Sequence, residues 1–246
     1  MKVYTSIRLE SGDTYAEIAM AVNTAVAKGA KVMNNSWGWV GAPDSTIETA
    51  VNNALAAGVV VVFAAGNGPD RSPYTYDVAF PGNMTSNTDV ICIGATSQTD
   101  EHKASASSDG QFSWGSSYIG SGPDVCAPGP WSYTIDRLGA DGYNDGSLLP
   151  DPDYAPSFGG TSSAAPKASG IVALLLSANP DLTPAEIKNI LRTTADDIDI
   201  PGIDDKTGAG RINAHSALMA VIPEPFCFSF FLCYLLILSG RKRSII

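Results

Sequence analysis

The chain has 246 residues, of which 44% are hydrophobic, so it is long enough to bury a core in one large domain or two small ones. A formal net charge of −10 and a pI near 4.5 argue against nucleic acid as a partner, because phosphates repel an acidic surface. The four cysteines have neither metal-ligand spacing nor a disulfide framework, and no signal-peptide pattern opens the sequence.

Strand-like and helix-like segments alternate along the first hundred residues. The expected strands cover residues 2–9, 31–37, 59–65 and 90–95. A helix is expected over residues 14–28, where apolar residues recur at helical spacing, and it ends at Gly29. A second helix begins at Ser45–Glu48, a capping-box pattern, and ends at Gly58. This rhythm predicts an α/β fold: right-handed βαβ units forming a mostly parallel sheet with helices on both faces.

The segment Gly159–Pro166 lies between a long polar loop and the apolar run 169–176. A serine at such a junction falls at a helix N-terminus, where unpaired N–H groups and the positive end of the helix dipole face outward. That environment suits an attacking hydroxyl and the negative charge that it creates on a carbonyl oxygen. Taken alone, the octapeptide is equally compatible with a Gly/Ser/Thr turn that caps a buried helix.

A second motif follows the β-branched run 59–63, which is typical of a strand buried on both faces. The run continues into Ala64-Ala65-Gly66-Asn67. An asparagine at the end of a parallel strand can offer its amide N–H₂ to an oxyanion. The alternative is a turn asparagine, favoured there because Asn tolerates left-handed backbone.

Together the two motifs resemble those of the subtilisin-like serine proteases, the subtilases. Gly160–Pro166 matches the nucleophile motif of that family, and Ala64–Asn67 matches its oxyanion motif. Asn34–Gly38 resembles the strand that lines its substrate cleft, and Asp124–Gly129 the segment before its nucleophile loop. The resemblance extends from about residue 2 to about residue 220. It implies a three-layer subtilisin-like fold and a polypeptide substrate.

The resemblance also implies roles for individual residues. Ser162 is the expected nucleophile, and its own N–H forms the oxyanion hole with the side chain of Asn67. The residues expected to bind the substrate are Ser36, Trp37, Gly38, Ala64, Ala65 and Gly66. Ser163 and Lys167 depart from the Met and His that many members carry, at positions that are not catalytic.

The Asp and His of the family triad precede the nucleophile in the order Asp, His, Ser, and neither has a recognisable counterpart before Asn34. Asp13 lies in a polar turn, and His102 and His215 are expected to be surface residues. The sequence is therefore interpreted as a fragment, in which residues 1–221 form the C-terminal part of a subtilase catalytic domain whose N-terminal part is missing.

Two other functions stay open. A catalytically inactive, surface-sorted domain that keeps only a peptide-binding cleft is the alternative to a serine endopeptidase. An α/β-hydrolase esterase is disfavoured, because it needs Gly-x-Ser-x-Gly with Asp and His after the serine, and Ser162 is followed by Ser163 and Ala164.

Residues 128–160 have no clear periodicity and are rich in Gly, Asp, Pro and Tyr, so a surface loop is expected there. Its aspartates carry the oxygen ligands that calcium prefers, but the twelve-residue calcium-loop pattern is absent. A solvated loop is the better interpretation, and we expect neither a cofactor nor a metal site. After it, helices are expected from Ser162 to Ala178, from Thr183 onward, and after a cap at Asn213.

Residues 222–246 differ from the rest of the chain. Pro223-Glu224-Pro225 precedes the apolar run 226–238, and Arg241-Lys242-Arg243 follows it. This order resembles the PEP-CTERM sorting signal of Gram-negative bacteria, and a plain hydrophobic terminus is the alternative. The resemblance implies processing by an exosortase-type membrane enzyme, membrane contact through 226–240, and export to the cell surface or medium.

Overall fold

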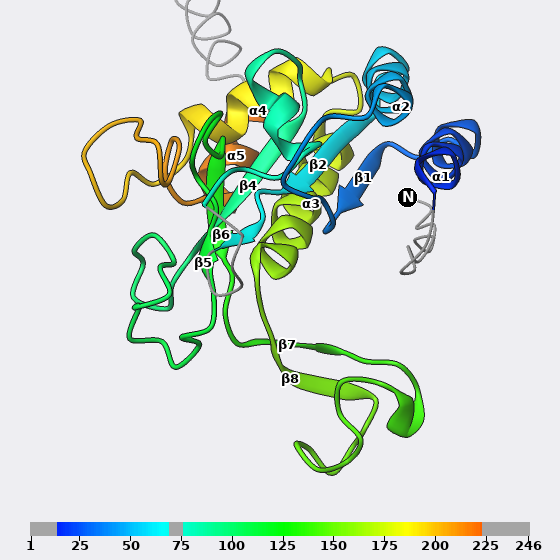
Figure 1. Ribbon diagram of the computed structural model, residues 1–246. Coiled ribbons are helices and arrows are strands. Elements are labelled where there is room, and N and C mark those ends of the chain that lie inside the picture. The colour runs from blue at the N-terminus through cyan, green and yellow to red at the C-terminus, as the bar shows by residue number, and fades with distance from the viewer. Residues whose placement is uncertain (1–13, 69–75, 223–246) are drawn as a thin grey trace, which may run out of the picture.

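The computed structural model describes residues 14–68 and 76–222 (Figure 1). Its centre is a sheet of four parallel strands, β1 (Val32–Asn35), β2 (Val60–Ala64), β4 (Ile91–Thr96) and β6 (Val125–Pro128), in the order β1-β2-β4-β6. Strands β1, β2 and β4 lie where the sequence predicts strands, and β6 falls in the segment 124–129, where no strand is predicted from the sequence. The expected strand over residues 2–9 lies outside the described residues.

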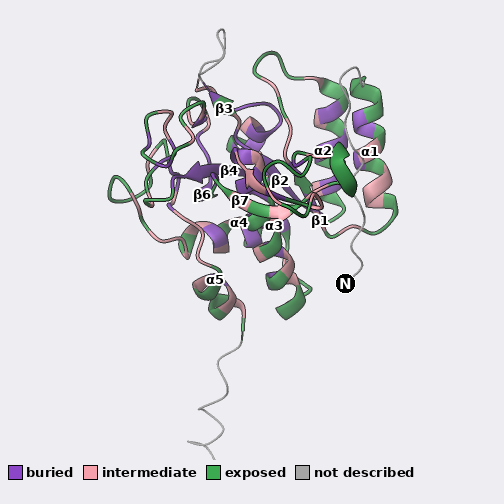
Figure 2. Ribbon diagram, turned by 90° about the horizontal axis from the view of Figure 1, so that it is seen from below, coloured by how far each residue is buried: buried purple, intermediate pink, exposed green. Residues whose placement is uncertain are grey.

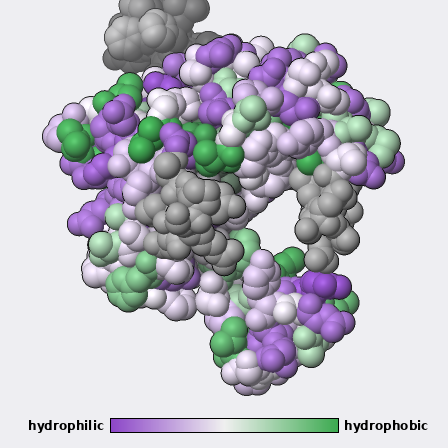
Figure 3. Space-filling model, in the orientation of Figure 1, coloured by the Kyte–Doolittle hydropathy of each residue, from purple (hydrophilic) through white to green (hydrophobic). Residues whose placement is uncertain are grey.

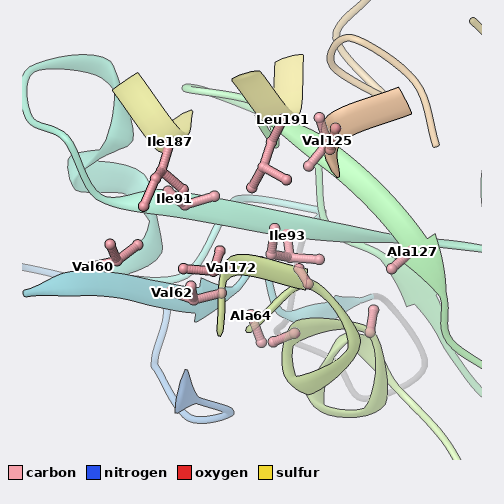
Figure 4. Close-up of a cluster of buried hydrophobic side chains, with 14 of the residues drawn as sticks. Val60, Val62, Ala64, Ile91, Ile93, Val125, Ala127, Val172, Ile187 and Leu191 are labelled. Atoms are coloured by element: carbon pink, nitrogen blue, oxygen red, sulfur yellow. The ribbon is translucent and has the colours of Figure 1, made fainter. Parts of the chain in front are cut away.

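Helices cover both faces of the sheet. On one face lie α1 (Tyr15–Ala27) and α2 (Ser45–Ala56); on the other lie α3 (Thr161–Ala178), α4 (Pro184–Thr193) and α5 (Ala214–Val221). Strand β2 shows why both faces are needed, since every one of its residues is buried. The side chains of Val60 and Val62 pack with residues of α3 and α4 (Figure 4), whereas Val61 and Phe63 belong to the cluster that contains residues of α1 and α2. Figure 2 shows the buried strands at the centre of the molecule.

Local capping fixes where several helices begin. Thr14 and Thr183 each form a capping box, with Glu17 and Glu186 three residues later. The capping box expected at Ser45 is wrong by one residue. The cap is Asp44, whose carboxylate accepts hydrogen bonds from the N–H groups of Thr46 and Ile47, so that Ser45 is already helical.

The segment expected to be an irregular loop contains an antiparallel hairpin. Its strands are β7 (Ser132–Ile135) and β8 (Tyr154–Phe158), and the short 3₁₀ turn η2 (Gly139–Asp141) lies between them. The hairpin stands off the body of the molecule, below α3 in Figure 1. The sequence hides it because the strands are short and the connection between them is long.

Smaller elements complete the fold. They are β3 (Asn67–Gly68), paired with β5 (Gly115–Ser116), and the 3₁₀ helix η1 (Gly82–Ser86). Within the described residues, no helix is long and apolar enough to cross a membrane, and no group of acidic, His or Cys side chains is arranged to hold a metal ion. The apolar run 226–238 lies outside these residues.

Candidate active site

The carboxyl ends of β1 and β2 meet the N-terminus of α3. Ser36 directly follows β1, and Ala65, Gly66 and Asn67 follow β2. The chain enters α3 through Gly160, and Ser162 is the second helical residue. Because β1 and β2 are parallel, their following residues lie at the same sheet edge, which is where ligands gather in open α/β sheets.

Ser162 and Ser36 hold each other at this edge. The hydroxyl of Ser162 donates to the main-chain carbonyl of Ser36 at 3.2 Å, and the hydroxyl of Ser36 donates to the carbonyl of Ser162 at 2.9 Å. Asn34 supports the pair, because its side-chain amide donates to the Ser36 hydroxyl at 3.0 Å. The nucleophile predicted from the sequence is therefore positioned by the strand predicted to line the cleft.

Asn67 reaches the same helix terminus. Its side-chain oxygen accepts a hydrogen bond from the N–H of Thr161 at 2.8 Å and another from the Thr161 hydroxyl at 3.0 Å, across 94 positions of sequence. The Thr161 hydroxyl in turn accepts from the N–H of Gly66 at 3.1 Å. The expected convergence of Asn67 with the nucleophile segment is present.

Two hydrogen-bond donors at this terminus stay unused within the described part of the chain. They are the N–H of Ser162 and the side-chain N–H₂ of Asn67. The Asn67 nitrogen lies 3.0 Å from the point where a Cβ on Gly160 would be, so the amide is next to the turn that enters the helix. Two adjacent free donors at a positive helix end can stabilise an oxyanion.

The expected substrate-binding residues differ in how accessible they are. Trp37 is half-buried, with its ring edge-on to Phe63, and Gly38 is exposed. A Cβ on Gly38 would lie 2.7 Å from the carbonyl oxygen of Phe80, so only glycine lets these two backbones approach. Of the residues predicted to bind substrate, Gly38 is therefore the exposed one.

Ala64 and Ala65, by contrast, are buried and stand behind the site. The main chain of Ala65 is occupied, because its N–H donates to the carbonyl of Ile93 and its carbonyl accepts from the N–H of Ala79. Gly66 uses its N–H for Thr161 and its carbonyl for Ser117. These three residues therefore hold Asn67 in place from behind.

The described residues bring no general base to Ser162. The expectation that His102 is a surface residue is wrong: it is buried, edge-on to Tyr118, and its Nε2 lies 3.1 Å from the carbonyl of Ser116. Burial lowers the pKa of His102, so the imidazole is held neutral inside the fold. His215 is exposed on α5, as expected.

Sequence reasoning missed the role of Lys167. Its ammonium group donates to the carbonyl of Pro128 at 2.6 Å, to the hydroxyl of Ser132 at 2.6 Å and to the hydroxyl of Ser163 at 3.1 Å. Ser132 and Ser163 also hydrogen-bond each other. Burial lowers the pKa of Lys167 from its usual value. The spacing of the two departures from the family motif could have indicated this contact, because positions 163 and 167 are one helical turn apart.

A second missed feature buttresses the segment before the nucleophile. Lys103 is fully buried, and its ammonium group donates to the carbonyls of Ala104, Gln111 and Trp114 and lies 3.6 Å from the Asp109 carboxylate. The loop so fixed places Gln111 against the nucleophile segment. A Cβ on Gly159 would lie 2.5 Å from the Gln111 side-chain oxygen.

Comparison with known proteins agrees with this geometry. The model of the subtilase family matches residues 1–210. A calcium-dependent protease of Nostoc sp. is 36% identical over 230 residues, which cover 81% of this chain and 33% of that protein. An extracellular protease of Xanthomonas campestris pv. campestris is 36% identical over 214 residues, which cover 86% of this chain and 31% of that protein.

The crystal structure of fervidolysin from Fervidobacterium pennivorans, a keratinolytic enzyme related to subtilisin, superposes with a TM-score of 0.64 at 29% identity. The match covers 85% of this chain and 29% of fervidolysin, so this chain spans about a third or less of the length of these three relatives. The α/β sheet with helices on both faces is thus a subtilisin-like fold. The chain belongs to the subtilase family of serine proteases.

Proposed function

We propose that the chain is the part of a serine endopeptidase that carries the nucleophile and the oxyanion hole. Ser162 is the nucleophile, and the two donors are its own N–H and the side-chain N–H₂ of Asn67. The observation that carries the proposal is the meeting of Asn67 and Thr161–Ser162 at one helix N-terminus, where neither donor has a partner among residues 14–68 and 76–222. A carbonyl oxygen placed there accepts from both.

The reaction that fits this arrangement is acyl transfer. The Ser162 hydroxyl leaves the Ser36 carbonyl, attacks the carbonyl carbon of a peptide bond and gives its proton to a base. The oxyanion so formed accepts hydrogen bonds at the helix terminus until the C–N bond breaks and the amine departs with that proton. Water then attacks the acyl-serine ester, which regenerates the Ser162 hydroxyl and releases the acid.

The accessible stretch after β1 is suited to hold the substrate. Ser36, Trp37 and Gly38 follow a strand at the edge of the sheet, and Gly38 is exposed. An extended peptide can pair with such a stretch through main-chain hydrogen bonds. We therefore infer that the acyl side of a polypeptide lies along residues 36–38, with its scissile carbonyl between Ser162 and Asn67.

By itself this chain is expected to hydrolyse peptides hardly at all, because Ser162 has no histidine or carboxylate partner among the described residues. A serine hydroxyl is a weak nucleophile without a base. In a subtilisin, loss of the histidine alone lowers kcat by about 2 × 10⁶. The same observation favours the second candidate function, an inactive domain that only binds peptides.

Acylation by an activated ester separates the two functions. A p-nitrophenyl ester has a good leaving group, and added imidazole supplies a base in solution. The expected result for the endopeptidase site is one equivalent of p-nitrophenol per chain, formed faster as imidazole is raised and lost in Ser162→Ala. A chain that binds peptides yet shows the same ester reaction with and without Ser162 is a binding domain, and the catalytic proposal is then wrong.

We also propose that the protein is exported and that residues 222–246 act as a PEP-CTERM-like sorting tail, processed by an exosortase-type enzyme at the membrane. Support for export comes from the relative of Xanthomonas campestris, whose name is extracellular protease. Support for the tail is its order of Pro-Glu-Pro, apolar run and basic cluster. Export through a sorting tail suits a protease whose substrates are polypeptides outside the cell.

A further inference from the structure

The β7–β8 hairpin exposes far more apolar surface than its size requires. Seven of the seventeen large hydrophobic side chains that are exposed in the described chain belong to residues 131–154, and among them Ile135 is 78% exposed and Leu138 is 83% exposed. Figure 3 shows the hairpin as a lobe below the body, with hydrophobic and hydrophilic residues interspersed. A concentration of this kind on one element is typical of an interaction surface.

One face of the hairpin is organised rather than random. Ile135 is the cross-strand partner of Tyr154, and the ring of Tyr154 stacks on that of Tyr133 with centroids 5.8 Å apart. Cross-strand partners share a face, so Tyr133, Ile135 and Tyr154 form one exposed apolar face, here called the hairpin face. Among the described residues this sheet consists of β7 and β8, so each strand has an outer edge along which an extended peptide can lie.

The hairpin is fixed relative to the nucleophile. Phe158 ends β8, and Ser162 follows four positions later. At the other strand, the hydroxyl of Ser132 is bound to Lys167 and Ser163 of α3, so both strands are tied to the nucleophile helix at their base. A ligand on the hairpin is therefore held at a set position from Ser162, on an element other than residues 36–38.

The net charge of the hairpin limits which ligands can bind to it. Residues 131–158 contain five aspartates and one arginine, a net charge of −4. Asp141 is exposed within the loop that connects the two strands. Anionic partners such as nucleic acid or an acidic lipid surface are repelled, whereas Lys and Arg side chains are attracted. An extended polypeptide with both apolar and cationic side chains matches the apolar face of the hairpin and its negative charge.

We propose that the β7–β8 hairpin is a second substrate-binding surface, which takes the part of a polypeptide that extends beyond Ser162 and selects segments in which Lys or Arg alternate with apolar residues. This rests on the proposed function of Ser162 and adds the substrate class. Residues 36–38 bind the part of the substrate on one side of the scissile bond. The hairpin face binds the part on the other side, further from that bond. Selection then depends on the hairpin and not on the oxyanion donors.

Binding of labelled peptides to the full chain tests this without any need for turnover. The probes are one peptide with alternating Lys and Phe, and a matched peptide in which Glu replaces Lys. Fluorescence anisotropy is expected to show tighter binding of the lysine peptide by about tenfold or more at low salt, with the preference shrinking as salt is raised. Equal affinities for the two peptides overturn the proposal.

Matched substitutions localise the binding. Ile135→Ser and Asp141→Asn on the hairpin are each expected to lower the affinity for the lysine peptide by about threefold to tenfold. Their controls are Ile203→Ser, at a side chain that is 72% exposed elsewhere, and Asp89→Asn, at an exposed turn, which leave the affinity within about twofold. All four positions are on the surface, so each variant is expected to fold. Circular dichroism checks this. If hairpin and control variants bind alike, the surface is not the hairpin.

Acylation distinguishes failure of this proposal from failure of the proposed function. The hairpin variants are expected to react with p-nitrophenyl ester at the wild-type rate, whereas the lysine peptide slows acylation of the wild type at lower concentrations than it does in Ile135→Ser. Acylation at Ser162 with no such difference refutes the hairpin surface alone. Absence of any acylation at Ser162 removes the substrate role of the hairpin together with the proposed function.

Discussion

Ser36 and Ser162, 126 positions apart, exchange hydrogen bonds in both directions, each hydroxyl donating to the other residue's main-chain carbonyl. The bond to the Ser36 carbonyl points the Ser162 hydroxyl at the strand along which a peptide is proposed to lie. Because that acceptor is a main-chain oxygen, the hydroxyl keeps its proton until a base removes it. On the proposed function, the reciprocal pair describes a serine that is positioned for attack but not activated.

Replacing Asn67 is expected to separate its two roles, which are to hold Thr161 through its side-chain oxygen and to stabilise the oxyanion through its side-chain N–H₂. In Asn67→Asp the side chain keeps an oxygen to accept from Thr161 but loses the N–H₂ donor and gains negative charge. Acylation of Ser162 by an activated ester is expected to fall by about 10²–10³, the loss found when a subtilisin loses its oxyanion amide. Stopped-flow release of p-nitrophenol measures it, and Asn87→Asp on an exposed turn is the control. An unchanged rate would remove Asn67 from the oxyanion hole.

Gly160 is expected to be intolerant of any side chain. Its φ of 89° and ψ of 170° lie in a region that is open almost only to glycine, and an added Cβ would lie 3.0 Å from the Asn67 nitrogen. Gly160→Ala should lower the free energy of unfolding by about 1–3 kcal/mol and slow acylation as well. The matched change Gly170→Ala, in the same helix with open space around it, should raise stability by about 0.5–1 kcal/mol. Urea unfolding compares the two, and a similar effect of both would show that the turn is not strained.

Asp124 is expected to be the most sensitive acidic residue of the fold. Its carboxylate is buried, lies 2.9 Å from the Arg192 guanidinium and 3.5 Å from the Lys188 ammonium, and accepts from the N–H of Cys92. Asp124→Asn removes the carboxylate charge that neutralises Arg192 and Lys188, and should cost about 3 kcal/mol of unfolding free energy. Denaturant midpoints measure the change against the exposed control Asp89→Asn. A loss below about 0.5 kcal/mol would mean that the cations find other partners.

His102 is expected to make stability depend on pH without taking part in catalysis. Burial is the largest cause of its lowered pKa, so in the window between the folded pKa and the usual value near 6.5 the unfolded chain binds more protons than the folded one. Stability should therefore rise as pH rises through that window and be lowest below it. His102→Gln should flatten this slope in thermal unfolding. The acylation rate should stay at the wild-type value, and a loss of acylation would contradict the absence of a catalytic role for His102.

Deletion of residues 223–246 tests the proposed sorting tail. In a Gram-negative host with an exosortase-type enzyme, the full chain is expected in the membrane fraction first and later as a shortened, exported form. The deleted chain should lack both forms, because the apolar run and its basic cluster are gone. A matched variant in which the three basic residues 241–243 become Gln isolates the charge. Equal partitioning of the full and deleted chains would contradict the membrane role.

Much of the fold could be predicted from local chemistry. The β-branched run at 59–63 has no polar position to expose and must lie between two layers, which the structure confirms. Thr183 caps a helix as expected, because the cap and its glutamate are only three residues apart, and Thr14, expected to be the first helical residue, caps its helix in the same way. The motif at Gly160–Pro166 likewise predicted a helix that begins at Ser162, and the helix begins one residue earlier.

Other features were decided by contacts that no short stretch of sequence contains. His102 lies in a polar stretch and yet is buried, because Ser116, 14 positions later, and Tyr118 contact its ring. The hairpin of residues 132–158 has no periodic signal, because its pairing bridges a long connection. Lys167 appeared to be a neutral departure until tertiary folding brought Pro128 and Ser132 to its ammonium group.

The division follows from the range of the forces. Hydrophobic periodicity, capping and glycine turns act within a few residues, so the sequence by itself determined the layers, the helix starts to within one residue, and the residue types of the site. The placing of Asn67, Ser36 and Ser162 within hydrogen-bonding distance needs the parallel pairing of β1 with β2 and the packing of α3 against them. Only the tertiary structure decides such contacts, because a hydrogen bond forms only once packing has fixed both partners to within a fraction of an ångström.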